Sequence, residues 1–239
     1  MTRAAGRPPL TWDEYATAWS GLHGGFDPRR TSPVVRGWLR MAYAGGSLLG
    51  RLRVAPTAVT AVGLLICLCV PLAARYGPAG LFAAAALVLL AGVADALDGA
   101  VAVVTGRVSR LGFVYDSVAD RIGEAAWLTA FWFAGAPGPL VVAGGVVCWL
   151  HEYVRARSAG AGMRGVGVVT VGERPTRVSV ALIGLLLGGV GGLLRSDLQA
   201  GTVTVAAVVW LVLSLIGLGQ LVGVVRRELS APEDPAAHR

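Results

Sequence analysis

Five acidic residues fall within two apolar stretches of the chain. Asp95 and Asp98 belong to the first stretch, and Asp116, Asp120 and Glu124 belong to the second. An acidic side chain at the centre of a membrane costs roughly 2.5 kcal/mol or more. Because the chain has only 14 acidic residues, this placement needs a common explanation. Carboxylate oxygens are the ligands that Mg²⁺ and Mn²⁺ prefer, so the acids predict a divalent metal site.

The spacing of these acids predicts that they converge. Asp95 and Asp98 are three residues apart, and Asp116 and Asp120 are four apart, so each pair shares one face of a helix. The connection between the two stretches is short, which makes the helices antiparallel neighbours with both pairs at a similar depth. Four carboxylates gathered there repel one another unless cations lie between them, and they suffice for two ions.

Two other interpretations of the acids are weaker. They could form an inert ion network with Arg107, Arg110 and Arg121, but buried ion pairs rarely stabilise a protein more than apolar packing does. They could also serve a cation transporter, which would leave the arginine-rich segment 155–177 unexplained. We therefore favour the metal site.

The elements that must position the acids are membrane helices. Hydrophobic residues make up 55% of the chain and charged residues only 15%, against about 25% charged in soluble domains. Apolar stretches of about 18 residues or more are typical of helices that span a bilayer. We predict an all-α membrane protein with six transmembrane helices at residues 56–74, 78–104, 111–134, 138–154, 176–194 and 203–225.

The arginines predict the orientation of these helices. All 21 basic residues are arginines, and all but Arg75, Arg121 and Arg195 lie in segments on one side of the predicted spans. Positive residues favour the cytoplasmic side. We therefore expect a multi-pass protein of the cell membrane, with both termini and the acidic site cytoplasmic. The arginines form no basic arm, which argues against a nucleic-acid partner.

The chain divides into three parts. Residues 1–50 are predicted to form an amphipathic interfacial segment: Thr11 and Glu14 have the spacing of a capping box, and aromatic residues alternate with arginines as in helices at a membrane surface. A soluble extension without membrane contact is the alternative. Residues 51–226 hold the six spans, and 227–239 are predicted to be a disordered tail. The scattered His23, His151 and His238 are interpreted as interfacial or solvated.

The acid pairs belong to a longer pattern of fixed residues: Asp95, Asp98, Gly99, Ala102, Gly112, Asp116 and Asp120. This pattern resembles the CDP-alcohol phosphotransferase motif, DxxDGxxAR followed by GxxxDxxxD, with every spacing kept. Val103 stands where the family has arginine. The resemblance implies that all four aspartates bind metal, that Asp120 is also the general base, and that the protein is a homodimer.

Further residues extend the resemblance on both sides of the motif. Segment 56–60 is similar to a family segment that holds the CDP group, and the donor-binding residues implied are Thr57, Thr60, Gly99, Ser109 and, in place of Val103, Arg107. Segments 152–157 and 172–177 are similar to actinobacterial phosphatidylinositol phosphate synthases. That similarity implies an acceptor-phosphate site made by Arg155, Arg157 and Arg177.

The resemblance implies a metal-dependent enzyme of phospholipid biosynthesis. It would transfer a phosphatidyl-type group from CDP-diacylglycerol to the hydroxyl of a polyol phosphate such as inositol phosphate, and release CMP. Glycerol phosphate is the second candidate acceptor, and an alcohol without phosphate is a third. From a different class, Val103 and the unexplained residues 1–50 suggest a catalytically silent membrane scaffold.

Overall fold

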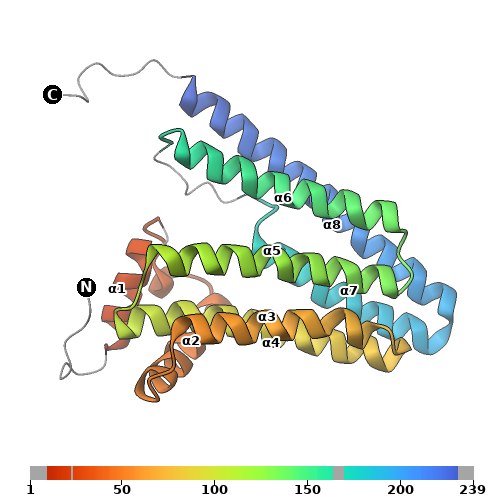
Figure 1. The fold of residues 1–239 in the computed structure, drawn as a ribbon, viewed down its shortest axis with the longest axis horizontal. Helices are drawn as coiled ribbons and strands as arrows, with labels where there is room; N and C mark the ends of the chain where they lie inside the picture. The colour runs from red at the N-terminus through yellow and green to blue at the C-terminus, as the bar shows by residue number, and fades with distance from the viewer. Residues whose placement is uncertain (1–9, 23, 164–169, 231–239) are drawn as a thin grey trace.

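The computed structural model describes residues 10–22, 24–163 and 170–230, and every element it places there is a helix (Figure 1). In chain order the elements are α1 (Trp12–Leu22), η1 (Pro28–Arg30), α2 (Pro33–Arg51), α3 (Pro56–Ala74), α4 (Gly77–Thr105), α5 (Arg110–Phe133), α6 (Gly138–Gly160), α7 (Arg174–Leu194) and α8 (Ser196–Leu229).

Helices α3, α4 and α5 run along the long axis of the molecule, and α6 and α8 are inclined to them (Figure 1). From α3 to α8 the chain reverses direction between successive helices (Figure 1). Proline in the first turn begins α3, α4, α6 and α7, because it removes an amide that a helix start leaves unpaired. Helix α4 ends at Gly106, whose φ of 67° is left-handed. The short connection that follows makes α4 and α5 antiparallel, as the sequence predicted.

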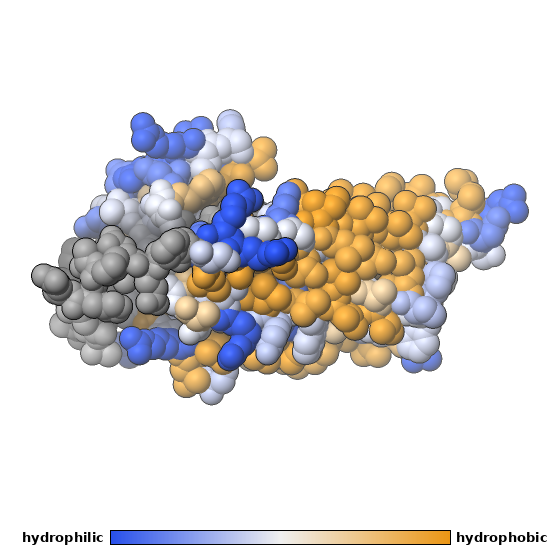
Figure 2. Space-filling view, turned by 90° about the horizontal axis from the view of Figure 1, so that it is seen from above, coloured by the Kyte–Doolittle hydropathy of each residue, from blue (hydrophilic) through white to orange (hydrophobic). Residues whose placement is uncertain are grey.

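Four of these helices, α3, α4, α7 and α8, are long and apolar enough to cross a membrane. The third and fourth predicted spans, α5 and α6, differ from these four helices because they carry charged residues such as Asp120, Glu124 and Glu152. Apolar side chains cover a continuous zone of one face, and hydrophilic side chains gather at its two ends (Figure 2). This pattern is that of a multi-pass membrane protein.

The main apolar core lies where α3, α4, α5, α7 and α8 meet. Large buried side chains such as Leu81, Trp127 and Trp210 fill it. Glycines let the helices approach closely there; a Cβ added at Gly184 would lie 2.5 Å from the Ala206 Cβ. Small residues of this kind are typical of helix contacts in membranes. The core fixes α7 against α4 and α5, which positions the candidate site.

Residues 10–51 form two helices joined by the short η1 helix. The capping box is confirmed: the Thr11 amide donates to the Glu14 carboxylate at 2.7 Å, and the Glu14 amide donates to the Thr11 hydroxyl at 3.3 Å. At the other end α8 continues to Leu229, so the start of the predicted tail, residues 227–229, is helical. The rest of that tail, 231–239, lies outside the described residues.

Candidate active site

A pocket opens among α3, α4, α5 and the start of α7. Four predicted metal ligands and one arginine line it together with apolar side chains from α3. The polar lining residues are Thr60, Asp95, Asp98, Asp116, Asp120 and Arg174. The structure therefore brings the two predicted acid pairs to one place.

Three of the four aspartates converge closely. One carboxylate oxygen from each of Asp95, Asp116 and Asp120 lies within 4.8 Å of the other two. Asp95 comes from α4, while Asp116 and Asp120 lie one turn apart on α5. An all-oxygen set at this spacing suits a hard divalent cation, and its three negative charges favour one. The cluster thus fits the predicted metal.

Asp98, the fourth predicted ligand, is held differently. Its carboxylate accepts a hydrogen bond of 2.6 Å from the Thr60 hydroxyl of α3, and the residue is 7% exposed. It lines the pocket but does not belong to the tight group of three. This hydrogen bond joins Thr60, a predicted donor-binding residue, to Asp98 of the predicted metal site. The two predicted sites are therefore adjacent.

Arg174, at the start of α7, provides the positive charge nearest these acids. One of its guanidinium nitrogens lies 3.3 Å from an Asp95 oxygen, another pairs with Asp120, and the guanidinium lies over the Trp127 ring at 5.6 Å. The sequence argument did not select Arg174 as a site residue. Its place in the 172–177 segment, at the first turn of a predicted span, could have identified it as a site residue.

The other predicted donor-binding residues do not line the pocket. Thr57 and Gly99 are exposed, and a Cβ added at Gly99 would meet nothing within 4 Å. Ser109 caps α5, where its hydroxyl accepts the Gly112 amide at 3.0 Å. Arg107 is exposed in the connection between α4 and α5. Gly99 in particular leaves open space beside Asp98 for a ligand to approach.

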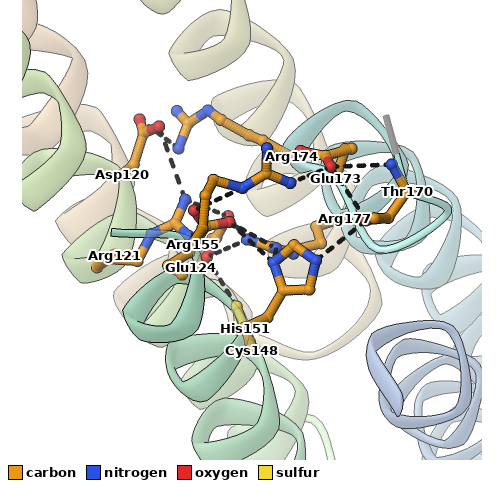
Figure 3. Close-up of polar contacts among 11 residues, drawn as sticks. Asp120, Arg121, Glu124, Cys148, His151, Arg155, Thr170, Glu173, Arg174 and Arg177 are labelled. Carbon is orange, nitrogen blue, oxygen red and sulfur yellow. Dashed lines mark hydrogen bonds and ion pairs between the residues drawn. The ribbon is translucent and has the colours of Figure 1, made fainter. Parts of the chain in front are cut away.

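A second charged cluster is buried beside the pocket, centred on Glu124 (Figure 3). The Glu124 carboxylate accepts hydrogen bonds from Arg121 at 3.0 Å, from Arg177 at 2.9 Å and from the Cys148 thiol at 2.9 Å. It is fully buried. Glu124 follows Asp120 by one helical turn, so the same stripe of α5 carries both clusters.

Arg177 belongs to this cluster. It is 3% exposed, and its second terminal nitrogen donates to Glu152 of α6 at 2.9 Å. Arg121 also pairs with Glu152, at 2.9 Å. The inert ion network considered from the sequence therefore exists in part, because Arg121 forms buried ion pairs. Arg107 and Arg110 are exposed. The observed network lies beside the four aspartates and is centred on Glu124. Arg177 holds α5, α6 and α7 together instead of facing an open pocket.

The cluster continues into the segment before α7. Arg155 of α6 pairs with Glu173, which also accepts from the Thr170 amide at 3.0 Å (Figure 3). The Thr170 hydroxyl lies 3.0 Å from a ring nitrogen of His151. His151 is fully buried, so the prediction that it is interfacial or solvated was wrong; His23 and His238 lie outside the described residues. Arg157, in contrast, is exposed.

The sequence pattern of the CDP-alcohol phosphatidyltransferase family matches residues 53–224. The chain therefore belongs to that family. The match includes every predicted site residue and leaves α1, η1 and α2 outside it.

Several members of the family resemble this chain in sequence. The phosphatidylinositol phosphate synthase of Mycolicibacterium smegmatis is 35% identical over 155 residues, which cover 59% of this chain and 64% of that protein. The archaetidylinositol phosphate synthase of Aeropyrum pernix is 39% identical over 105 residues, covering 42% and 50%. The aligned segments thus span less than two thirds of these relatives' own lengths.

Solved structures of the Mycobacterium tuberculosis phosphatidylinositol phosphate synthase share the fold. The structure with CDP-DAG bound matches with a TM-score of 0.61 and 26% identity, over 84% of this chain and 98% of that one. The complex with manganese and citrate matches with a TM-score of 0.62 and 28% identity, over 77% and 88%. The second structure contains manganese, which agrees with the use of a divalent metal.

Proposed function

We propose that this protein transfers a phosphatidyl-type group from CDP-diacylglycerol to a hydroxyl of inositol phosphate and releases CMP. The observation that carries the proposal is the convergence of Asp95, Asp116 and Asp120 opposite Arg174 in one pocket. The family match and the inositol phosphate synthases among the relatives support the reaction and the acceptor.

The metal we propose is Mg²⁺ or Mn²⁺, with two ions bound. Among the described residues that line the pocket, four aspartates face a single arginine, so the negative charge is in excess. Asp95, Asp98, Asp116 and Asp120 would hold the ions. Bound there, divalent cations would neutralise charge on the pyrophosphate of the donor and on the attacking and leaving oxygens.

The chain's own residues supply the proton transfer. Asp120 would accept the proton of the acceptor hydroxyl as that oxygen forms a bond to the lipid-bearing phosphorus. The bond from this phosphorus to the CMP oxygen breaks, and CMP leaves with that oxygen. The pairing of Asp120 with Arg174 places a cation at the carboxylate that would perform this step. The hydrogen bond from Thr60 orients Asp98 beside it.

Donor and acceptor would approach from different helices. For the CDP group we propose Thr57, Thr60, Gly99, Ser109 and Arg107, which surround the α3–α4–α5 side of the pocket. The open space at Gly99 supports this side for the nucleotide.

For the acceptor's phosphate we propose the α6–α7 side. Arginine suits this role because its planar guanidinium can bind two phosphate oxygens. Arg155 and Arg157 keep the role implied by the resemblance, and Arg174 joins them because it reaches the aspartates. Arg177 has both terminal nitrogens engaged by Glu124 and Glu152, so we assign it to holding the site.

The membrane arrangement we propose has six spans, α3 to α8, within the domain 51–226. Its support is the alternation of the helices and the gathering of arginines at one end of them. By that distribution both termini and the pocket face the cytoplasm, in the cell membrane. Residues 1–50 would lie at the membrane interface. The protein would act as a homodimer.

The experiment that tests the function measures CMP release by the purified protein with CDP-diacylglycerol and Mg²⁺. Inositol phosphate, glycerol phosphate, inositol and serine are supplied in turn. We expect release with inositol phosphate and its loss on chelation of the metal. Release with glycerol phosphate alone would replace the proposed acceptor. No release with any acceptor would contradict the enzyme assignment and favour the scaffold suggested by Val103.

A further inference from the structure

Two features that the family pattern does not account for meet in one place. The family match begins at residue 53, so α1, η1 and α2 precede it. Within the match, Val103 of α4 stands at the motif position where the family has arginine. Val103 is 8% exposed and belongs to one buried apolar cluster with Tyr15 of α1 and Ala42 of α2. The unusual residue is thus covered by the additional segment.

The segment that covers Val103, residues 10–22 and 24–30, is called here the N-terminal cap. Tyr15 is its anchor: the side chain is 1% exposed, and burial raises its pKa to about 12. The Tyr15 ring lies 5.2 Å from that of Tyr43 on α2, and the Tyr43 hydroxyl donates to the Leu10 carbonyl at 2.5 Å. The cap is therefore packed on α2 and α4 as one unit.

The cap and α2 are fixed to the stretch of α4 that follows the motif aspartates. A Cβ added at Gly46 would lie 2.7 Å from the Ala100 Cβ, so α2 and α4 are in close contact there. Ala100, Val103 and Val104 all contribute to the cluster. An arginine at position 103 would place a charged group among apolar and aromatic side chains, which costs free energy unless the charge finds a partner. Valine suits this packing and arginine does not.

The same stretch of α4 forms a wall of the pocket. Asp98 lines the pocket, and the exposed Gly99 follows it one turn before Val103. A helix is stiff over so short a distance, so displacement of Val103 also displaces Asp98 and Gly99. We propose that Val103 is the docking position of the N-terminal cap, and that docking of the cap is coupled to binding of the CDP-lipid donor beside it on α4.

This inference rests on the proposed function for the identity of the donor. Its docking part rests on the packing alone. Coupling of two sites is reciprocal: if the docked cap strengthens donor binding, the donor must strengthen docking by the same factor. Both directions are measurable in the full-length protein.

The test is hydrogen exchange at the amides of α1, with and without CDP-diacylglycerol in mixed micelles containing Mg²⁺. In the unmodified protein we expect the donor to slow exchange in α1. Val103→Arg should accelerate exchange there by about tenfold or more, because the cap opens locally. The donor's dissociation constant should rise several-fold, and added donor should protect α1 less.

Two further variants separate docking from misfolding of the bundle. Tyr15→Ala alters only the cap side of the cluster and should reproduce both effects. Val34→Arg makes the same chemical change at a residue that is 82% exposed and should leave exchange in α1 and donor affinity unchanged. Exchange in α7, a helix remote from the cap, reports whether the bundle itself stays folded in each variant.

Three outcomes would overturn the inference or part of it. Unchanged exchange in α1 of Val103→Arg would show that Val103 does not dock the cap. Equal or tighter donor binding by Val103→Arg, with a loosened cap, would show that docking is not coupled to the donor. Absence of donor binding by the unmodified protein would instead contradict the proposed function and the coupling with it, while the exchange data still decide the docking.

Discussion

Two charged clusters lie one helical turn apart on α5 and differ in how their charges are matched. Around Asp120 three carboxylates converge, and Arg174 is the arginine that lines the same pocket. Around Glu124 two acids, Glu124 and Glu152, are shared among Arg121, Arg155 and Arg177. The Glu124 side chain is 1% exposed against 15% for Asp120. One cluster has an excess of negative charge beside an open pocket, and the other is buried and paired.

This difference indicates that the Asp120 cluster binds a ligand and that the Glu124 cluster stabilises the helices. A buried ion pair contributes little net stability, but removing one partner is costly because the other charge is left alone. The Glu124 cluster joins α5, α6 and α7 through such pairs, so it fixes the helices that carry the pocket. The pocket aspartates carry more negative charge than Arg174 offsets, so a bound cation would supply the remaining positive charge. The same acid-to-amide substitution should therefore lower activity in the Asp120 cluster and stability in the Glu124 cluster.

The largest effect is expected for Asp120→Asn. The amide cannot accept the proton of the acceptor hydroxyl and is a weaker metal ligand, so CMP release should fall by about 10³-fold. The unfolding midpoint in detergent should stay within a few degrees of the unmodified value, since no buried arginine loses its only partner. A wild-type rate in this variant would refute the assignment of the base.

Glu124→Gln makes the same chemical change one turn further along α5. Here Arg121 and Arg177 are left to share Glu152 as their carboxylate partner in a buried site. One positive charge is then uncompensated, so we expect a loss of about 3 kcal/mol in stability. Thermal unfolding in detergent micelles measures it directly. If the Gln variant unfolds at the wild-type temperature and instead loses only activity, Glu124 belongs with the aspartates and the contrast between the clusters fails.

The sequence predicts one of these clusters far better than the other. The aspartates follow from spacing on two consecutive helices, because residues three or four apart share a face and a short connection brings the faces together. The capping box at Thr11 and Glu14 is equally local. In the same way the first predicted span, 56–74, coincides with α3.

The partners of the second cluster depend on contacts between distant segments. Glu124 and Arg177 are 53 residues apart in the chain, and only the packing of α7 against α5 decides that Arg177 turns inward while Arg174 reaches the aspartates. The burial of Val103 depends in the same way on α1, far upstream. Periodicity along one helix carries no information on such pairings. For this reason the sequence analysis did not select Arg174 and wrongly predicted that His151 is interfacial or solvated.

Arg174 is the arginine that lines the pocket with the aspartates, and replacing it should give the smallest of the three effects. Because its nitrogens pair with Asp95 and Asp120, it competes with any cation for two of the three converging carboxylates. Arg174→Gln should therefore tighten Mn²⁺ binding by about tenfold, or 1.4 kcal/mol, measured by paramagnetic resonance of free Mn²⁺. The KM for the acceptor should rise at the same time, since a phosphate-binding arginine is lost.

Arg155→Gln is the matched control, because Arg155 pairs with Glu173 outside the pocket lining. It removes the same charge and should raise the KM for the acceptor without changing the affinity for Mn²⁺. Arg174→Lys, which keeps a charge but not the planar fork, should retain the weaker metal binding of the unmodified protein. If Arg174→Gln binds Mn²⁺ no more tightly than Arg155→Gln does, the guanidinium does not compete with the metal. The aspartates would then hold the cation and Arg174 at the same time, and the excess of negative charge in the pocket would be larger than one arginine can offset.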